Sequence, residues 1–294
     1  MIIFTVTLTR QASYHSILSE ILRTPISAFV NLSDYPFQPN YIDLLNPGSI
    51  RDGKTKLRLH YLDEGNKSSP ETILLLHGEP SWSYLYRHFI SKLKKYRVIA
   101  VDLTGFGFGS LIGLQLVGTN GVGDRFAQIV AANDGLPIGN GKISKGFIQW
   151  LDFASQQTEM DVGRVIKSGV IKDMKQEEID AYNAPFPNEQ YQAGALVFPL
   201  LVPITPENPS SEFNRQAWKN LKNFNRPFLT LFSDSDPITG GLDKILQSMI
   251  PGAKNQSHTT ITDAGHFLQE DKPHEIVEHL IKFIKDNPLI LARL

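Results

Sequence analysis

The sequence contains no cysteine among its 294 residues. This absence excludes disulfide bonds, thiolate nucleophiles and cysteine-ligated metal sites, and it is compatible with a reducing compartment. No apolar run approaches the roughly 20 residues that cross a bilayer. The apolar opening, residues 1–9, lacks the basic start and the small-residue cleavage site of a signal peptide. Charge is balanced, with 29 Lys and Arg against 30 Asp and Glu, so no net field favours nucleic acid or an anionic membrane. We expect a cytoplasmic protein with neither partner.

A nucleophile elbow is also missing. Many hydrolases carry a Ser, Cys or Asp nucleophile on a tight strand-to-helix turn, with glycine two residues before it and two after it. No Ser or Asp of this sequence has both glycines. A hydrolase built from the remaining motifs would therefore lack the group that attacks its substrate.

Strand-like and helix-like segments alternate along the chain, which is typical of an α/β fold with a mostly parallel sheet flanked by helices. The continuous apolar run Ile73–Leu76 predicts a fully buried parallel strand. At the last predicted helix, Asp271 is expected to cap the first turn and Pro273 to lie within it. Other strands are predicted at 57–61, 98–101, 127–132, 228–232 and 259–262, and other helices at 82–95 and 111–118.

The strand pattern stops between residues 136 and 225. This stretch is rich in Pro, Gly and Asn and contains helix-like segments, including a capping-box start at Asp173-x-x-Gln176. We predict a helical cap at 136–225 that lies over the carboxyl ends of the strands, where ligands bind in such folds. The core would then consist of residues 21–135 and 226–294, with residues 1–20 as an N-terminal extension.

Three motifs that follow predicted strands supply candidate site residues. In His77-Gly78-Glu79-Pro80, the Glu79 N–H can serve as an oxyanion donor, although an ordinary strand-exit turn is the alternative. His266 follows Gly265 near the C-terminus, the place of a general base that comes last in the nucleophile, acid, histidine order.

The acid that would orient His266 is expected at Asp236, 30 residues earlier and directly after a predicted strand. We prefer it to its neighbour Asp234, because the following Pro237-Ile238 would turn the chain back over the pocket. Asp134 is a further candidate, but its Asn-Asp-Gly context favours a residue of a surface turn.

Longer strings make the chain similar to one family. It resembles the haloalkane dehalogenases of the α/β-hydrolase superfamily from about residue 21 to residue 285. The resemblance is strongest in the predicted cap. The strings that carry it are DYPFQPNY (34–41), YLDEG (61–65), HGEPSWSYLYR (77–87), DLTGFGFGS (102–110), YNAPFPNEQYQAGALVFPLLVP (182–203), FSDSDPIT (232–239) and AGHFLQE (264–270).

The resemblance implies hydrolytic removal of halide from a small apolar haloalkane, with water and halide as the other ligands and with no cofactor or metal ion. An aspartate would form an ester that the His266–Asp236 pair helps water to hydrolyse. Trp150 matches the halide-binding tryptophan of the cap, although a buried aromatic plug is the alternative. Residues matching the family's apolar pocket are Phe147, Phe198, Pro199, Val202 and Ile238; core packing is the simpler interpretation for each alone.

The chain departs from the family pattern after Ser110, which runs directly into Leu111. The family has there a loop, a helix, a central strand and the elbow Q-D-W-G-G, so one helix-strand unit, the nucleophilic Asp and a second halide-binding Trp are absent together. The shortened chain would keep a right-handed crossover provided that the strand at 127–132 closes up beside the strand at 72–76. Besides an impaired dehalogenase, the alternatives are a non-catalytic relic, an incomplete gene model, or a relative that hydrolyses epoxides or esters.

Overall fold

The computed structural model describes residues 21–45, 54, 56–105 and 109–289. Its first sheet has the order β1-β2-β4-β3 and joins β1 (Asn40–Leu45), β2 (Lys56–Gly65), β3 (Thr72–Leu76) and β4 (Arg97–Asp102). β2 runs antiparallel to both β1 and β4, whereas β3 and β4 are parallel. Alternate residues of β4 are buried, which fits a strand inside a sheet.

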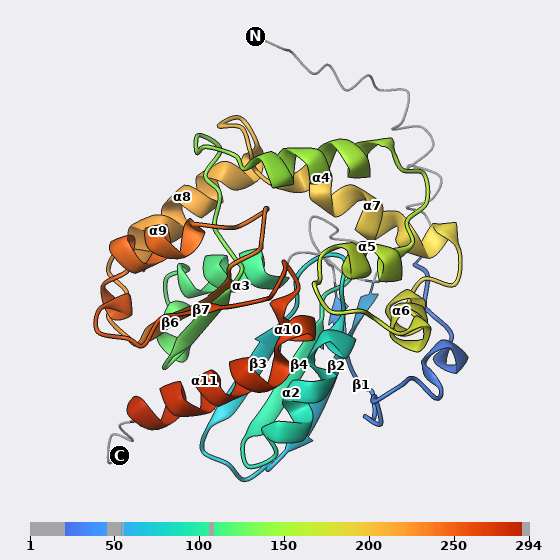
Figure 1. Ribbon diagram of the computed structural model, residues 1–294, viewed down its shortest axis with the longest axis horizontal. Coiled ribbons are helices and arrows are strands. Elements are labelled where there is room, and N and C mark those ends of the chain that lie inside the picture. Colours follow the sequence, from blue (N-terminus) through green and yellow to red (C-terminus); the bar gives the residue numbers. More distant parts are fainter. Residues whose placement is uncertain (1–20, 46–53, 55, 106–108, 290–294) are drawn as a thin grey trace.

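A second sheet has the order β5-β6-β7, and all of its strands are parallel. It consists of β5 (Ile129–Ala132), β6 (Phe228–Ser233) and β7 (Thr259–Ile261). All six residues of β6 are buried, as expected for a parallel strand covered on both faces. The predicted α/β architecture is therefore present, but it is divided between two sheets (Figure 1).

At the division between the sheets one prediction is wrong, and the condition for a right-handed crossover is not met. Within the described residues, β3 pairs with β4 alone and β5 with β6 alone, so β5 does not close up beside β3. β3 is consequently an edge strand, and Leu74 keeps 41% of its surface exposed although we predicted full burial. The cap packs over both sheets (Figure 1). Closing the gap would require the second sheet to move as a body beneath it.

The core helices follow the predictions with shifted ends. The predicted helix at 82–95 begins as the 3-10 turn η2 (Ser83–Tyr86) and continues as α2 (Arg87–Lys92). α3 (Gly109–Val117) starts two residues before the predicted 111. The last helix, α11 (Pro273–Asp286), has Pro273 in its first turn, but its N-cap position is Lys272 and not Asp271. The remaining core elements are η3 (Gly123–Arg125), α9 (Leu242–Met249), η5 (Pro251–Ala253) and α10 (Leu268–Asp271).

Helices fill the segment that we proposed as the cap. They are α4 (Lys145–Gln156), α5 (Val162–Ser168), α6 (Gln176–Asn183), η4 (Glu189–Gln192), α7 (Ala193–Leu201) and α8 (Pro209–Leu221). Near the N-terminus, η1 (Ile26–Phe29) precedes β1. The predicted capping box lies two residues further on, because Glu178 Oε2 accepts the N–H of Lys175 at 2.9 Å and Asp173 is not the N-cap.

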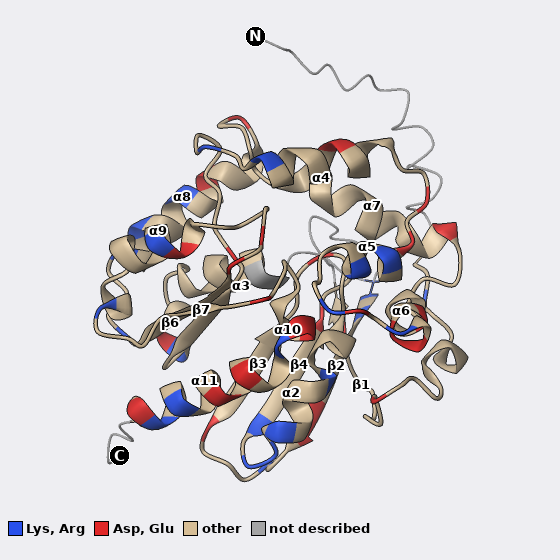
Figure 2. Cartoon of the chain, viewed as in Figure 1, with Lys and Arg blue, Asp and Glu red and all other residues tan. Residues whose placement is uncertain are grey.

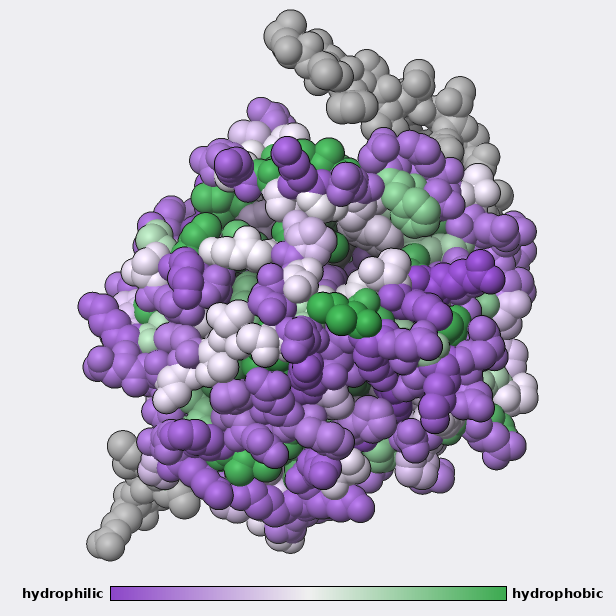
Figure 3. Space-filling view, in the orientation of Figure 1, coloured by the Kyte–Doolittle hydropathy of each residue, from purple (hydrophilic) through white to green (hydrophobic). Residues whose placement is uncertain are grey.

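The buried apolar residues fall into two clusters that follow the two halves of the fold. One joins the first sheet, α2, α11 and the cap to one face of β6 and to β7, and the other lies between the opposite face of β6, β5, α3, α8 and α9. Acidic and basic residues are interspersed over the helices (Figure 2), and the face in Figure 3 is mainly hydrophilic with smaller apolar groups. In the described part of the chain, no helix is both long and apolar enough to cross a membrane.

Candidate active site

A cavity of about 1740 Å³ lies where the two sheets face each other beneath the cap. It is larger than the roughly 300–1,000 Å³ of a small-molecule pocket, because it includes the gap between β3 and β5. Its walls include residues that follow the carboxyl ends of four strands: Glu79 after β3, Asp134 after β5, Ile238 after β6 and His266 after β7. The carboxyl ends of the strands thus converge on one site, as is usual in α/β folds.

Asp236 and His266 meet at this cavity. His266 Nδ1 lies 3.0 Å from Asp236 Oδ2, so the predicted contact is confirmed. The carboxylate also accepts the N–H groups of Ile238 and Thr239 and the Thr239 hydroxyl. Burial raises the pKa of Asp236, but the hydrogen bonds from His266, Thr239 and Ile238 outweigh burial, so its pKa lies below the ordinary value. An ionised Asp236 can fix the proton on Nδ1 and leave Nε2 free to accept one.

The other two candidate acids have different hydrogen-bond partners. Asp234 is exposed and accepts the N–H groups of Asp263 and Ala264 in the adjacent turn. Asp134 is only 7% exposed and lines the cavity, so our interpretation of it as a surface-turn residue was wrong. Its Oδ1 accepts the N–H of Gly135 at 2.7 Å.

The sequence analysis missed Asn133. This residue is buried, and its amide nitrogen donates to the carbonyl oxygens of Gly265 and His266 at 3.0 and 2.9 Å. Its amide oxygen accepts the N–H of Ser233 at the end of β6. Asn133 therefore connects the histidine loop, residues 262–267, to the ends of β5 and β6. Asn-Asp-Gly predicts an exposed turn, and only the position at a strand's carboxyl end could have indicated this role.

Glu79 lies in the cavity wall directly after β3, where its N–H was predicted to act as an oxyanion donor. The side chain is 7% exposed, and among the described residues its Oε1 has no hydrogen-bond partner. Burial raises the pKa of this carboxyl well above its usual value, which favours its neutral form. The neutral form of a carboxyl is a poor nucleophile, so burial disfavours Glu79 as a replacement for the missing group.

The predicted pocket residues separate into two sets. Trp150 lines the cavity from α4, where its ring stacks on Phe153 at 5.8 Å between centroids. Phe147, Val202 and Ile238 also line the cavity. Phe198 and Pro199 are not among its lining residues, although both belong to α7; the Phe198 ring lies instead against Gly105.

Asp102 forms structural contacts at the end of β4. Its Oδ1 accepts the N–H of Ser83, and its Oδ2 contacts the Ser83 hydroxyl and His60 Nδ1. These bonds join β2, β4 and η2. These contacts place the carboxylate in the core, where it is 7% exposed.

One group of residues has the arrangement of a metal site. His88, Glu178 and Glu270 place one ligand atom each within 4.8 Å of one another. Both carboxylates already face cationic side chains, because Arg87 and Lys172 form ion pairs with each of them. These two side chains supply the positive charge that a bound metal ion would bring.

No family model matches the chain. A haloalkane dehalogenase of Psychrobacter cryohalolentis is 46% identical over 310 aligned positions, which cover 92% of this chain and 99% of that protein. A haloalkane dehalogenase of Mycobacterium marinum is 37% identical, with 90% and 99% covered.

Solved structures agree. The tetrameric haloalkane dehalogenase of Paraglaciecola agarilytica superimposes with a TM-score of 0.78 at 28% identity, covering 93% of this chain and all of that one. A haloalkane dehalogenase of Agrobacterium tumefaciens, at 22% identity and a TM-score of 0.68, supports the fold. On the sequence identity and coverage of these relatives, the chain belongs to the haloalkane dehalogenase family, which has the α/β-hydrolase fold.

Proposed function

We propose that this chain carries the site of a hydrolase that removes halide from small haloalkanes, and that it lacks the nucleophile that starts the reaction. The main support for this proposal is the 3.0 Å contact between Asp236 Oδ2 and His266 Nδ1 at a cavity beneath the cap, in a chain 46% identical to a haloalkane dehalogenase. The substrate, the halide and water are its proposed ligands. Residues 136–225 are the proposed cap over a core formed by 21–135 and 226–294.

In the proposed reaction, a carboxylate oxygen attacks the carbon that bears the halogen, and the bonding electrons leave with the halide. The resulting ester is hydrolysed by water, which gives a proton to His266 Nε2 while its oxygen attacks the ester carbonyl. Asp236 stabilises the imidazolium that forms. The Glu79 N–H is the proposed donor to the ester oxyanion, and the Trp150 indole is the proposed donor to halide.

The lengths of the alignments support a missing segment. In the comparison with the Psychrobacter protein, 92% of the 294 residues is about 270, so about 40 of the 310 aligned positions face no residue of this chain. A unit of strand, helix and strand takes about 30 residues or more. The deficit is therefore large enough for one helix, one strand and their connections.

The gap in the sheet supports the same interpretation. β3 and β5 end at one cavity, yet each lacks a partner on the side that faces it, within the described residues. A parallel strand placed between them would end beside Asp236 and His266, where a nucleophile is needed. Re-reading the genomic DNA between the codons of Ser110 and Leu111 would show whether a coding stretch was skipped.

We expect the purified chain to release no halide from 1,2-dibromoethane or 1-bromobutane above a protein-free blank. Without a nucleophile no ester forms, so His266 has nothing to hydrolyse. Ion chromatography of bromide over several hours checks this, with a family dehalogenase as the positive control.

Steady bromide release that disappears in the His266→Ala variant would contradict a missing nucleophile. It would direct attention to Asp134 or Asp102 as the attacking group. A folded chain that releases nothing but hydrolyses epoxides or esters would instead place the site in another substrate class.

A further inference from the structure

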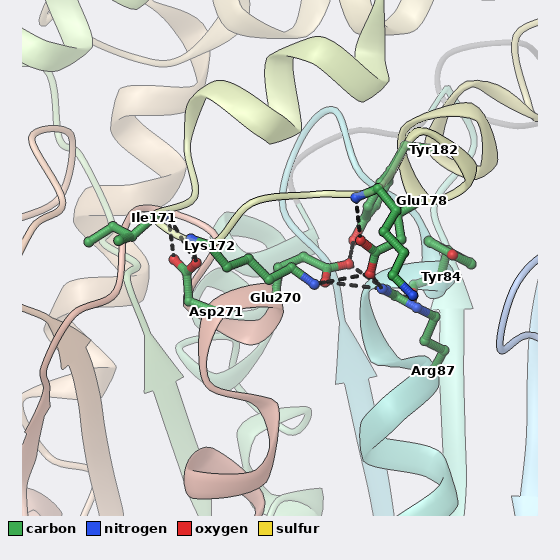
Figure 4. Close-up of polar contacts among 9 residues, drawn as sticks. Tyr84, Arg87, Ile171, Lys172, Glu178, Tyr182, Glu270 and Asp271 are labelled. Atoms are coloured by element: carbon green, nitrogen blue, oxygen red, sulfur yellow. Dashed lines mark hydrogen bonds and ion pairs between the residues drawn. The ribbon is translucent and has the colours of Figure 1, made fainter.

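Two carboxylates follow His266 within five residues and reach across to the cap. Glu270 and Asp271 are the last two residues of α10. Opposite them lies the segment between α5 and α6, residues 169–175, called here the cap loop. Figure 4 shows Asp271 directed to Ile171 and Lys172, and Glu270 on the opposite side of α10 facing Arg87 and Tyr182.

The Asp271 carboxylate joins the cap loop to the histidine loop. Its Oδ1 accepts the N–H groups of Ile171 and Lys172 at 2.9 and 2.8 Å. Its Oδ2 accepts the N–H of Gly265 at 2.8 Å, and lies 3.1 Å from the Ile171 nitrogen. One side chain thus satisfies backbone donors about 100 positions apart in the sequence, and one of them immediately precedes His266.

The residue after His266 is held by the same loop. The N–H of Phe267 donates to the carbonyl oxygen of Gly169 at 3.1 Å. Both glycines are needed for this close approach. A Cβ on Gly265 would lie 2.4 Å from the Gly169 oxygen, and one on Gly169 would lie 2.7 Å from the Phe267 ring. His266 is therefore anchored to the cap on both sides.

Glu270 supplies a second anchor on the other side of α10. Its carboxylate accepts from both Nη atoms of Arg87 and from the Tyr182 hydroxyl, and it forms an ion pair with Lys172 at 2.8 Å. Lys172 belongs to the cap loop, so its backbone bonds to Asp271 while its side chain bonds to Glu270. Glu270 and Asp271, two adjacent residues of α10, therefore both bond to the cap.

We propose that Asp271 is a positioning residue that couples the docking of the cap loop to the orientation of His266. While the cap loop is docked, Gly265 and Phe267 are fixed and Nδ1 stays on Asp236. When the cap loop leaves, Phe267 loses the Gly169 carbonyl, and the Asp271 carboxylate that holds Gly265 loses the two cap-loop N–H groups that orient it. This inference rests on the proposed role of His266 as the base, but its tests require no turnover.

Hydrogen exchange of the unmodified chain tests the coupling first. The amides of Ile171, Lys172, Gly265 and Phe267 should exchange at rates that agree within about threefold, because one opening event releases them together. Cap-loop amides that exchange more than about tenfold faster than those of Gly265 and Phe267 would overturn the proposal. Equal but unprotected exchange at all four would overturn it as well.

The Asp271→Asn variant tests the role of the carboxylate. If its amide oxygen stays on the cap loop, the NH₂ group faces the Gly265 N–H donor to donor and that bond is lost. Exchange at Gly265 and Phe267 should then accelerate about tenfold or more, in line with the loss of one buried hydrogen bond. The ¹⁵N-imidazole signals of His266, assigned with His266→Gln, should broaden.

Asp234→Asn is the matched control. Asp234 also accepts backbone N–H groups in the turn before His266, but among the described residues its carboxylate bonds to Ser235, Asp263 and Ala264 and not to the cap loop. Its substitution should leave the His266 signals and the exchange at Ile171 unchanged. Equal effects of the two substitutions, or an unchanged His266 spectrum in Asp271→Asn, would show that Asp271 stabilises only its local turn and would overturn the proposal.

Discussion

Insertion of a family-typical loop, helix and strand ending in Q-D-W-G-G between Ser110 and Leu111 is expected to restore halide release. The other proposed groups are in place, because Asp236 and His266 are in contact and Glu79 and Trp150 line the same cavity. Catalytic groups that act as a unit lose most of their rate when one is removed, so the gain should be on the order of 10⁴-fold or more. Bromide release from 1,2-dibromoethane measures it.

The same insertion should make unfolding more cooperative. A strand between β3 and β5 would pair two edges that have no partner in the described residues, and it would cover Leu74. Each buried group that gains a partner avoids about 1–3 kcal/mol, against a typical total stability of about 5–15 kcal/mol. The added strand would join the two sheets by backbone hydrogen bonds, so thermal unfolding should sharpen into one transition.

An insertion with Asn in place of the aspartate of Q-D-W-G-G is the control for chemistry. It should fold as the repaired chain does and release no bromide. A repaired chain that folds but hydrolyses only epoxides or esters would mean that our substrate class is wrong. One that folds and is inert towards all three would favour a non-catalytic relic.

The second large effect is expected at Arg87. Its guanidinium is fully buried, and it bonds to both oxygens of Glu270 and to Glu178 at 2.9 Å. Arg87→Met leaves the buried Glu270 carboxylate without its main partner, so the free energy of unfolding should fall by about 3–5 kcal/mol. Urea denaturation measures this, with Arg58→Met as the matched control at the exposed Arg58–Asp43 pair, where about 0–1 kcal/mol is expected.

A change at Arg87 should also alter the dependence of stability on pH. Burial raises the pKa of Glu270, but Arg87 and Lys172 outweigh burial and lower it to about 2. A carboxyl with a depressed folded-state pKa stabilises the fold above its unfolded pKa, about 4.3, and loses that contribution as pH falls towards 2. The acid-induced loss between these values, roughly 3 kcal/mol, should shrink in Arg87→Met. An unchanged pH profile would show that Arg87 does not set this pKa.

The sequence could predict features that depend on neighbouring residues. The apolar run at 228–232 is the buried strand β6, and the Gly265-His266 motif after a strand places the histidine at the cavity. The chain turn after Asp236 led us to prefer Asp236 over Asp234 as the partner of His266. The contact between Asp236 and His266 confirms this prediction.

Features that depend on distant partners could not be predicted in this way. Ile73–Leu76 has the composition of a buried strand, but β3 has one partner strand because no segment of the described residues pairs with its other side. Asp271 has the sequence position of a helix cap, yet its carboxylate accepts the N–H groups of Ile171 and Lys172 in the cap loop, about 100 residues away. Arg87 has a helical position that predicts exposure, and only the fold brings Glu178 and Glu270 to it.

The two unpaired strand edges also have a consequence for the protein as a solute. Backbone donors and acceptors along an open edge pair readily with a strand from another molecule, and natural sheets protect such edges with charge, proline or bulges. β3 reads Thr-Ile-Leu-Leu-Leu and β5 reads Ile-Val-Ala-Ala, and neither carries such protection. With a formal net charge of only −1, repulsion between copies is weak. These nine residues are therefore sites at which we expect pairing with another copy of the chain.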